Sequence, residues 1–377
     1  MASDDCEDEA LLRLAAAGGS VPARRRLLDT HGSATAALAA GMRDWRSHGL
    51  DDAQVHALSH PDENALACTR DWLTEPAHHL LGWQDPDYPA LLRRIASPPL
   101  LLYLAGDPAS LWHPMVAVVG TRSPTAGGRD NARDFAQALG ASGLGIVSGL
   151  AAGVDTEAHT GALAMGARTV AVLGTGPDVP YPRANTALHG RIVATGAVLS
   201  EHPPGTHARR EHFPSRNRII AGLALGTLVI EAAERSGALI TARMATEAGR
   251  DVFAVPGSIH NPLARGCHRL IREGAGLVET AQEVIDAIGP AAADLADALR
   301  GRLQAPTSPA AAEVHGACMP LAPEYKRLWD ALGCDPSGMD QLVGRTGLTV
   351  AELSSMLLVM ELEGRVAGEH GRYSRKR

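Results

Sequence analysis

The sequence predicts an α/β fold: a Rossmann-like, doubly wound parallel sheet, flanked by a small N-terminal helical domain and a C-terminal winged-helix domain. Short apolar runs alternate with helical stretches through the middle of the chain, and purely helical patterns precede and follow them. At ~150 residues per domain, 377 residues fit two to three domains. The 45 % of hydrophobic residues supplies packed cores, which excludes a fully disordered chain.

The predicted sheet domain covers residues 115–288. Six short aliphatic runs each end in Gly or a polar turn, and helical patterns of roughly 10–18 residues separate them. The runs are 115–120, 145–149, 169–174, 196–201, 226–232 and 251–257. Continuous apolar strands that alternate with helices are typical of a parallel sheet with helices on both faces.

The regions on either side differ in composition. Residues 1–75 contain Ala- and Leu-rich segments separated by Gly, which predicts a small helical domain. Pro and Asp are frequent over 76–114, and we interpret this stretch as a connector leading into the core. Residues 289–317 are Ala- and Pro-rich, which favours a linker. Three helical patterns and a short β segment over 318–377 predict a winged helix, a module that binds either DNA or protein.

The charge is segregated along the chain. The formal net charge is −7, yet six arginines and only two acids lie between Arg183 and Arg218. Net acidity therefore does not exclude nucleic acid as a partner. The only lysines are Lys326 and Lys376, which excludes a P-loop lysine from the middle of the chain.

Several classes of protein and site are disfavoured. The five cysteines are scattered without a CxxC pair, which argues against a disulfide framework and a Cys-rich zinc site. The histidine spacings match no metal template, so we expect neither metal nor cofactor. No apolar run approaches the ~18 residues of a membrane span, and the acidic N-terminal segment lacks a signal-peptide pattern. We expect a cytoplasmic protein without a membrane partner.

Ligands of open parallel sheets bind where the strands end, so the loops after the strands are the first candidates. Gly120, Thr121, Arg122 and Ser123 follow the first strand of this domain. A fixed positive charge beside two hydroxyls suits a phosphate, although an Arg paired with a nearby carboxylate is the alternative.

The next two loops offer close backbone approach and stacking. Gly149 and Gly153 bracket a helix start, where Asp155 and Glu157 are either catalytic acids or first-turn residues favoured by the helix dipole. Three further candidates lie in the loop after the third strand. Tyr181 can stack on a base, and Arg183 can bind a phosphate through its charge. Asn185 either caps the following helix or bonds a base edge.

Two further loops carry basic and hydroxyl groups. Phe213 stands among arginines just before Arg216, Asn217 and Arg218, an arrangement that suits single-stranded nucleic acid, with a solvated basic helix end as the alternative. Later, a small hydroxyl residue and a glycine precede a helix, which is an anion-binding geometry, and the acid of the preceding strand end is a candidate base. These residues are Ser236, Gly237 and Glu231.

Taken in order, these motifs resemble the DNA-processing protein A family (DprA, also called Smf). The resemblance is dense over roughly 80–290. It rests on VVGTR (118–122), SGLAAGVDTEAH (148–159), YPRAN (181–185), FPSRNRIIAG (213–222), SGALITAR (236–243), VPGS (255–258) and GCHRLIREGA (266–275). The flanking helical domain, of SAM-like type, and the winged helix match the longer members.

The resemblance implies a role in binding DNA rather than in catalysis. Members of the family bind incoming single-stranded DNA during natural transformation, shield it from nucleases and help load the RecA recombinase. The matching positions for DNA binding are Arg122 and Arg183, the latter in place of a frequent Lys. Members act as homodimers, and His268, Ile271 and Leu277 match the self-association stretch. The resemblance implies that RecA contacts an overlapping region.

Two rival functions stay open at this point. A nucleotide-cleaving Rossmann-like hydrolase would use Arg122 with Glu231 or Asp155. A transcriptional regulator would combine the winged helix with a nucleotide-sensing domain and bind specific duplex sequences. The visible residues present no base-edge code, so we expect single-strand binding with little sequence preference and a strong salt dependence.

Overall fold

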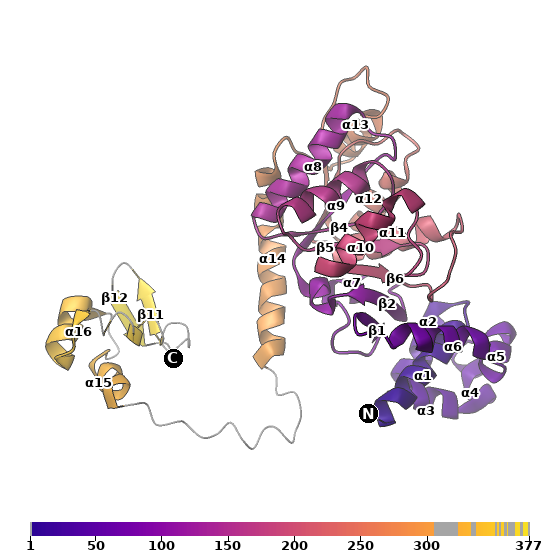
Figure 1. Cartoon of the computed structure of the whole chain (residues 1–377), viewed down its shortest axis with the longest axis horizontal. Helices are drawn as coiled ribbons and strands as arrows, with labels where there is room; N and C mark the ends of the chain where they lie inside the picture. Colours follow the sequence, from indigo (N-terminus) through magenta and orange to yellow (C-terminus); the bar gives the residue numbers. More distant parts are fainter. Residues whose placement is uncertain are drawn as a thin grey trace. The chain divides into compact units, whose positions relative to one another are not determined.

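The computed structural model describes residues 2–304, 323–332, 337–350, 353, 356–357, 360, 366–369 and 372–375. The chain divides into two compact units, Met1–Leu303 and Gln304–Arg377 (Figure 1). None of the helices in the described ranges combines the length and apolar character that a membrane crossing requires.

A nine-stranded sheet organises the large unit, in the order β1-β2-β6-β5-β4-β3-β7-β8-β9. The strands are β1 (His78–Gly82), β2 (Leu101–Gly106), β3 (Met115–Val119), β4 (Gly145–Ser148), β5 (Thr169–Leu173), β6 (Ala197–Ser200), β7 (Gly226–Val229), β8 (Asp251–Ala254) and β9 (Gly276–Leu277). From β6 to β9 all neighbours are parallel, whereas β2 runs antiparallel to both β1 and β6. The predicted doubly wound α/β sheet is therefore confirmed.

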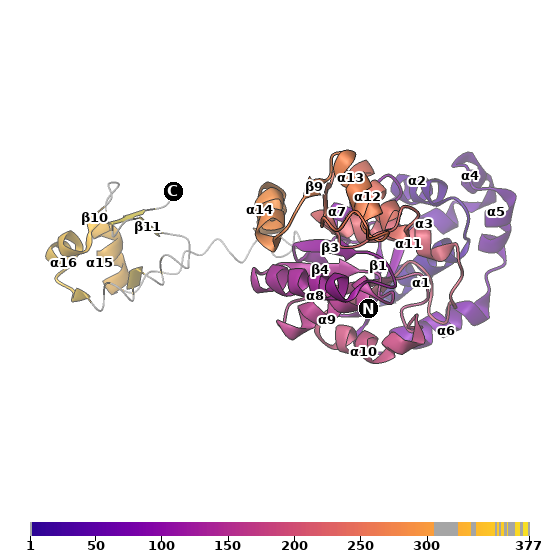
Figure 2. The same cartoon turned by 90° about the horizontal axis from the view of Figure 1, so that it is seen from above.

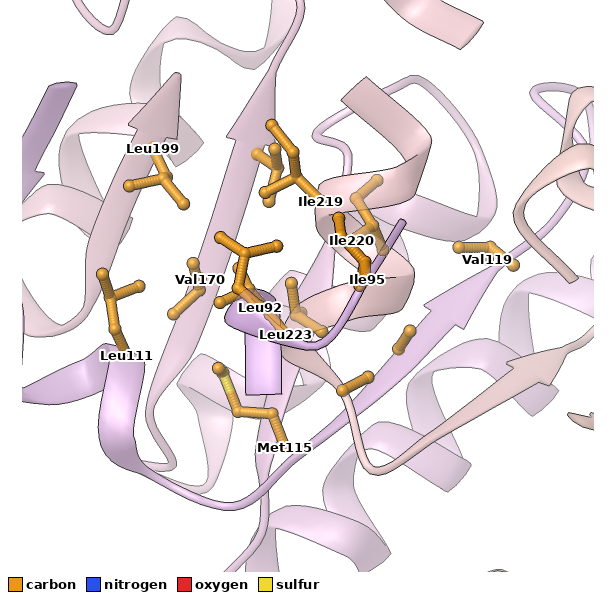
Figure 3. Close-up of a cluster of buried hydrophobic side chains, with 14 of the residues drawn as sticks. Leu92, Ile95, Leu111, Met115, Val119, Val170, Leu199, Ile219, Ile220 and Leu223 are labelled. Atoms are coloured by element: carbon orange, nitrogen blue, oxygen red, sulfur yellow. The ribbon is translucent and has the colours of Figure 1, made fainter. Parts of the chain in front are cut away.

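Helices cover both faces of this sheet, since alternate residues of a strand point to opposite sides. Val116 and Val118 of β3 pack in the core beneath α8, α9 and α14, whereas Met115 and Val119 pack beneath α7, α11 and α12. Figure 3 shows this second core, with Ile219, Ile220 and Leu223 of α11 close to the strands. Figure 2 shows α12 and α13 on one side of the strands and α8 and α9 on the other. The bounds are α7 (Ala90–Arg93), α8 (Ala126–Ala141), α9 (Val154–Ala164), α10 (Thr186–Thr195), α11 (His212–Leu223), α12 (Gly237–Glu247), α13 (Arg265–Arg272) and α14 (Ala281–Gln304), with short 3₁₀ turns η1 (Pro108–Trp112) and η2 (Arg183–Asn185).

Short helices form the N-terminal part, as the Ala- and Leu-rich segments predict. They are α1 (Ala2–Ala16), α2 (Val21–His31), α3 (Ala34–Ala39), α4 (Gly41–Ser47), α5 (Asp52–Ser59) and α6 (Glu63–Leu73). Asp51 and Gln54 form a reciprocal capping box at the start of α5, and the Asp62 side chain caps α6. The helices share one core with Leu101 and Tyr103 of β2, so this region packs directly on the edge of the sheet.

The interpretation of 76–114 as a connector misses its main feature. This stretch supplies β1 and β2, which extend the parallel sheet on one side. Both strands are only five or six residues long and stand between Pro- and Asp-rich turns, so their sequence reads as loop. Leu102 and Leu104 are fully buried in the sheet core.

The predicted linker at 289–317 begins too early. Helix α14 continues through Pro290 as far as Gln304, and residues 305–322 lie outside the described ranges. Pro lacks a backbone donor and usually ends a helix, which explains the expectation. Val284, Ile288 and Leu295 pack into the core beneath α8, and this burial holds the helix on both sides of the proline.

The C-terminal unit has the predicted winged-helix character. Its described elements are α15 (Pro323–Leu332), β10 (Ser337–Gly338), α16 (Met339–Thr346), β11 (Val366–Glu369) and β12 (Arg372–Arg375), and the strands pair antiparallel in the order β10-β12-β11. Leu328, Leu342, Leu357 and Val366 contribute to one core between helices and sheet. Much of the third predicted helix lies outside the described residues.

An ion pair fastens α11 to the end of β6. The two terminal nitrogens of Arg218 donate to the two carboxylate oxygens of Glu201 at 2.8 and 2.6 Å, and Nε donates to the carbonyl of Ser97 at 2.8 Å. Both side chains are more than four-fifths buried. Burial alone would raise the pKa of Glu201, but the hydrogen bonds and charge of Arg218 outweigh it and lower this pKa below its ordinary value. Arg218, which we predicted as a nucleic-acid contact, thus binds Glu201 and Ser97 and attaches α11 to the sheet.

We predict that Arg218→Met lowers the unfolding free energy of the large unit by about 3 kcal/mol, because it leaves a buried carboxylate unpaired. Denaturant unfolding followed by tryptophan fluorescence measures this, since Trp45, Trp72, Trp83 and Trp112 lie in this unit. The wild-type contribution is present above the ordinary Glu pKa and is lost as pH falls through the lowered folded pKa. The same loss from Arg46→Met, at an exposed pair with Asp52, would contradict this account.

Candidate nucleic-acid interface

A cavity of about 410 Å³ opens at the carboxyl ends of β3 and β7. It brings together residues from four of the predicted loops, which are far apart in sequence, and Asp155 represents the loop over 148–159. Among its lining residues are Gly120, Thr121, Arg122, Phe213, Arg216, Asn217, Ser236 and Gly237. The topology accounts for this, because parallel strands present their carboxyl ends at one edge of the sheet.

Arg216 forms the floor of this cavity and is 5 % exposed. One terminal nitrogen donates to the carbonyl of Gly149 at 2.6 Å and to the carbonyl of Val172, while Nε donates to Oδ1 of Asn217 at 3.0 Å. Burial lowers the pKa of Arg216 to about 10, a shift that the charge of Asp155 opposes. The guanidinium therefore stays charged at neutral pH.

Gly149 is required by this buried cation. A Cβ at this position would lie 2.2 Å from a terminal nitrogen of Arg216, so any side chain would displace the guanidinium. Its backbone N–H donates to Oδ2 of Asp155 at 3.1 Å, and Ala151 donates to the same atom at 3.2 Å. Burial raises the pKa of Asp155, and Arg216 and these donors oppose the rise. Gly149 thus lies beneath the cavity as a support rather than on its surface.

Arg122, Phe213 and Tyr181 form a cluster in which the first two line the cavity and Tyr181 packs against Phe213. The guanidinium carbon of Arg122 is 5.7 Å from the Phe213 ring centroid, within cation–π range. The Tyr181 and Phe213 rings lie 5.2 Å apart with a tilt of 41°, and Tyr181 is 44 % exposed. Across the described chain, the side chain of Arg122 makes no ion pair or hydrogen bond. An exposed cation therefore stands beside an aromatic pair in which Tyr181 is exposed and Phe213 is partly buried.

Glu231 holds the loop that carries Arg122. Its carboxylate accepts from the N–H and hydroxyl of Thr125 at 2.9 and 2.7 Å and from the amide of Asn261 at 3.2 Å. Its own carbonyl accepts from the N–H of Thr121 at 2.7 Å. Gly153, at φ +85°, lets the next loop approach the carbonyls of residues 121 and 122. The backbone at Arg122 is therefore held from two sides, while its side chain stays exposed.

The start of α12 supplies neutral donors and one unpredicted charge. Ser236 caps this helix by accepting from the N–H of Ala238 at 3.3 Å, and Gly237 is exposed beside it. Arg235, which sequence analysis overlooked, is exposed and lines the cavity. Its place directly before the Ser-Gly helix start is the signal that could have identified it, because that position faces the same anion-binding terminus.

Several predicted contacts lie elsewhere. Asn185 is buried and its amide donates to the carbonyl of Leu150 and the hydroxyl of Thr156, both at 2.9 Å, so it supports the neighbouring loop and does not cap α10 with its side chain. Arg218 is bound by Glu201, as described.

Two other predicted residues lie outside the cavity. Arg183 is exposed just after Tyr181, whereas Ser123 donates its N–H to Oγ1 of Thr121 at 3.3 Å. Neither Arg183 nor Ser123 lines the cavity.

The predicted self-association residues lie near one edge of the sheet. Leu277 of the edge strand β9 is 50 % exposed, and Ile271 of α13 is partly buried against the core. Nε2 of His268 lies 2.9 Å from the carbonyl of Gly257 and anchors a loop in which Ile259 is 76 % exposed. Ile259 is an apolar contribution that the sequence motifs did not indicate.

Comparison with known proteins assigns the family. The family model of DNA recombination-mediator protein A matches residues 79–289, and that of the DprA winged helix domain matches 306–372. Protein Smf of Synechocystis is 41 % identical over 318 residues, covering 78 % of this chain and 79 % of that protein.

Two solved structures agree with this assignment. DNA processing protein A of Streptococcus pneumoniae superposes with a TM-score of 0.66 at 38 % identity, over 73 % of this chain and 95 % of that one. DNA processing protein A of Helicobacter pylori, described for its single-stranded DNA binding mode, gives 0.51 at 28 % identity, over 56 % and 95 %. The chain therefore belongs to the family of DNA recombination-mediator protein A.

Proposed function

We propose that the chain binds single-stranded DNA at the strand-end cavity, in the cytoplasm, with little sequence preference and without cleaving it. The observation that carries this proposal is the exposed Arg122 against the Phe213–Tyr181 pair, above the buried charge of Arg216. Sequence-tolerant binding of single strands needs cations for the phosphates and aromatic faces for the bases. The Helicobacter pylori relative described above supports the choice of ligand.

The aromatic pair favours a single strand over a duplex. Stacking on Tyr181 requires a base with a free face, which an intact duplex does not offer. Two further exposed charges are available, Arg235 in the cavity lining and Arg183 two residues after Tyr181. Backbone N–H groups at the start of α12 add neutral donors for a further phosphate.

We infer further that two copies act together and that the DNA is passed to RecA. Leu277 of β9 and Ile259, in the loop that His268 anchors, are exposed apolar side chains, which suits a homodimer that sets two cavities on one strand. Membership of the family supports a role in protecting incoming DNA and loading RecA during natural transformation.

The rival hydrolase is disfavoured by the state of its carboxylates. Glu231 is bound by Thr125 and Asn261 and lines a different, smaller cavity. Asp155 lines the strand-end cavity, but it is buried and its Oδ2 accepts two backbone N–H groups. A general acid or base must reach the reacting atoms, and both groups are instead occupied in holding loops.

We predict that Arg122→Ala and Arg183→Ala each weaken binding of a labelled oligothymidylate about tenfold, because each removes a charge-assisted phosphate contact. Fluorescence anisotropy across a salt series measures this, and the slope of log K against log salt should fall by about 0.7 per lost contact. The control Arg46→Ala removes an exposed arginine of the N-terminal helices. Equal binding by all three variants would contradict the assigned site.

Gly149→Ala should reduce both stability and DNA affinity, because the added Cβ displaces the guanidinium of Arg216. We expect a loss of about 2–4 kcal/mol in unfolding free energy, typical of a disrupted buried charge network. The matched control is Gly190→Ala in α10, where a Cβ meets nothing within 4 Å. Denaturant unfolding and anisotropy are run on both, and indistinguishable variants would refute the role of Gly149.

Leu277→Asp should convert a dimer into a monomer, since it buries a charge in an apolar interface. Light scattering after size exclusion reports the mass, and anisotropy with short and long oligonucleotides reports whether the length dependence of affinity is lost. Met165→Asp, at a residue that is 49 % exposed at the end of α9, serves as the control. A wild-type mass of one chain would rule out the dimer.

A further inference from the structure

Three metal-ligating side chains gather in the N-terminal helices, outside the strand-end cavity. His31 lies in the last turn of α2, Asp44 lies on α4, and His48 directly follows α4. Nε2 of His31 is 2.8 Å from Oδ2 of Asp44, and Nδ1 of His48 is 3.2 Å from the same oxygen. All three ligand atoms lie within 4.8 Å of one another.

We propose that His31, Asp44 and His48 bind a divalent transition-metal ion of the zinc type. Two imidazole nitrogens and one carboxylate oxygen form a donor set that suits Zn²⁺. Asp44 and His48 are four residues apart and so share one face at the end of α4. The two nitrogen atoms already converge on one oxygen, so an ion can replace these two contacts after a small adjustment.

The surroundings allow an ion to enter and to complete its coordination. The three side chains keep between 19 and 33 % of their surface exposed, so water can supply the remaining ligand. The nearby Arg46 is paired with Asp52, and Arg26 donates to the carbonyl of His48 at 3.0 Å. The carboxylate of Asp44 offsets half of the charge of the ion.

Binding would require a change at His48. Its Nδ1 also lies 3.0 Å from the carbonyl of Asp44 and 3.4 Å from Oγ of Ser47. An imidazole nitrogen ligates through its lone pair, so this nitrogen must release its proton or that contact when the ion arrives. The ion would tie the end of α2 to α4 and hold the intervening α3 between them.

The test uses the full chain without an affinity tag, stripped with a chelator and then titrated with Zn²⁺ in competition with a chromophoric chelator. We expect one ion per chain. Asp44→Asn and His31→Gln should each weaken its affinity at least about 100-fold, since loss of outer-shell partners alone costs about 10–100-fold. The control His56→Gln alters a histidine of α5 that stacks on His60. It should leave the affinity unchanged.

Two further readouts separate ligation from misfolding. Bound Zn²⁺ should raise the Tm of the wild type and not that of Asp44→Asn, whose metal-free far-UV circular dichroism should match the wild type. Co²⁺ added to the wild type should give the visible bands of a tetrahedral nitrogen and oxygen site, a result that does not depend on any variant. Absence of these bands, or affinity equal to wild type in both ligand variants, would overturn the proposal.

Discussion

The burial of Arg216 is the constraint on which the candidate site depends. A guanidinium removed from water is costly unless its donors find acceptors, and here the carbonyls of Gly149 and Val172 provide them. Those carbonyls belong to the ends of two neighbouring strands, β4 and β5. The charge can be placed there only because residue 149 has no side chain and because Asp155 lies close by. The strand ends therefore supply the acceptors that Arg216 needs, and Arg216 in turn links the ends of β4 and β5.

Two arginines that are close in sequence on α11 have different roles because the helix directs their side chains to different faces. Arg216 and Arg218 are two residues apart, so their side chains do not share a face. Arg216 points to the strand ends beneath the cavity, whereas Arg218 is held by Glu201 and the carbonyl of Ser97. A basic cluster in sequence thus divides into one charge that shapes a site and one that attaches the helix to the sheet.

The sequence predicts the parallel sheet well and the finer placement of side chains less well. The six aliphatic runs identify β3 to β8 because a strand buried on both faces leaves a continuous apolar pattern. The sequence does not predict β1 and β2, because β2 packs against the N-terminal helices and such distant contacts leave no local pattern. Asn185 and Arg218 are polar residues in or next to loops that follow strands. Only the fold shows that their side chains already donate hydrogen bonds to other groups of the protein. His31 and Asp44 lie on different helices and come into contact only through helix packing, so their spacing in the sequence does not predict the contact.

The contacts of the nearby acids support the proposed role in binding over a role in cleavage. The acids nearest the cavity, Asp155 and Glu231, are both engaged by donors from the loops that they position. Withdrawing either one to serve a reaction would release the loop that carries Arg122 or the support beneath Arg216. A site built in this way holds the charge of Arg216 and the backbone of the Arg122 loop in place before any ligand arrives. In the proposed function, Arg122 would contact phosphates and the rings of Tyr181 and Phe213 would contact base faces, whatever the sequence of the strand.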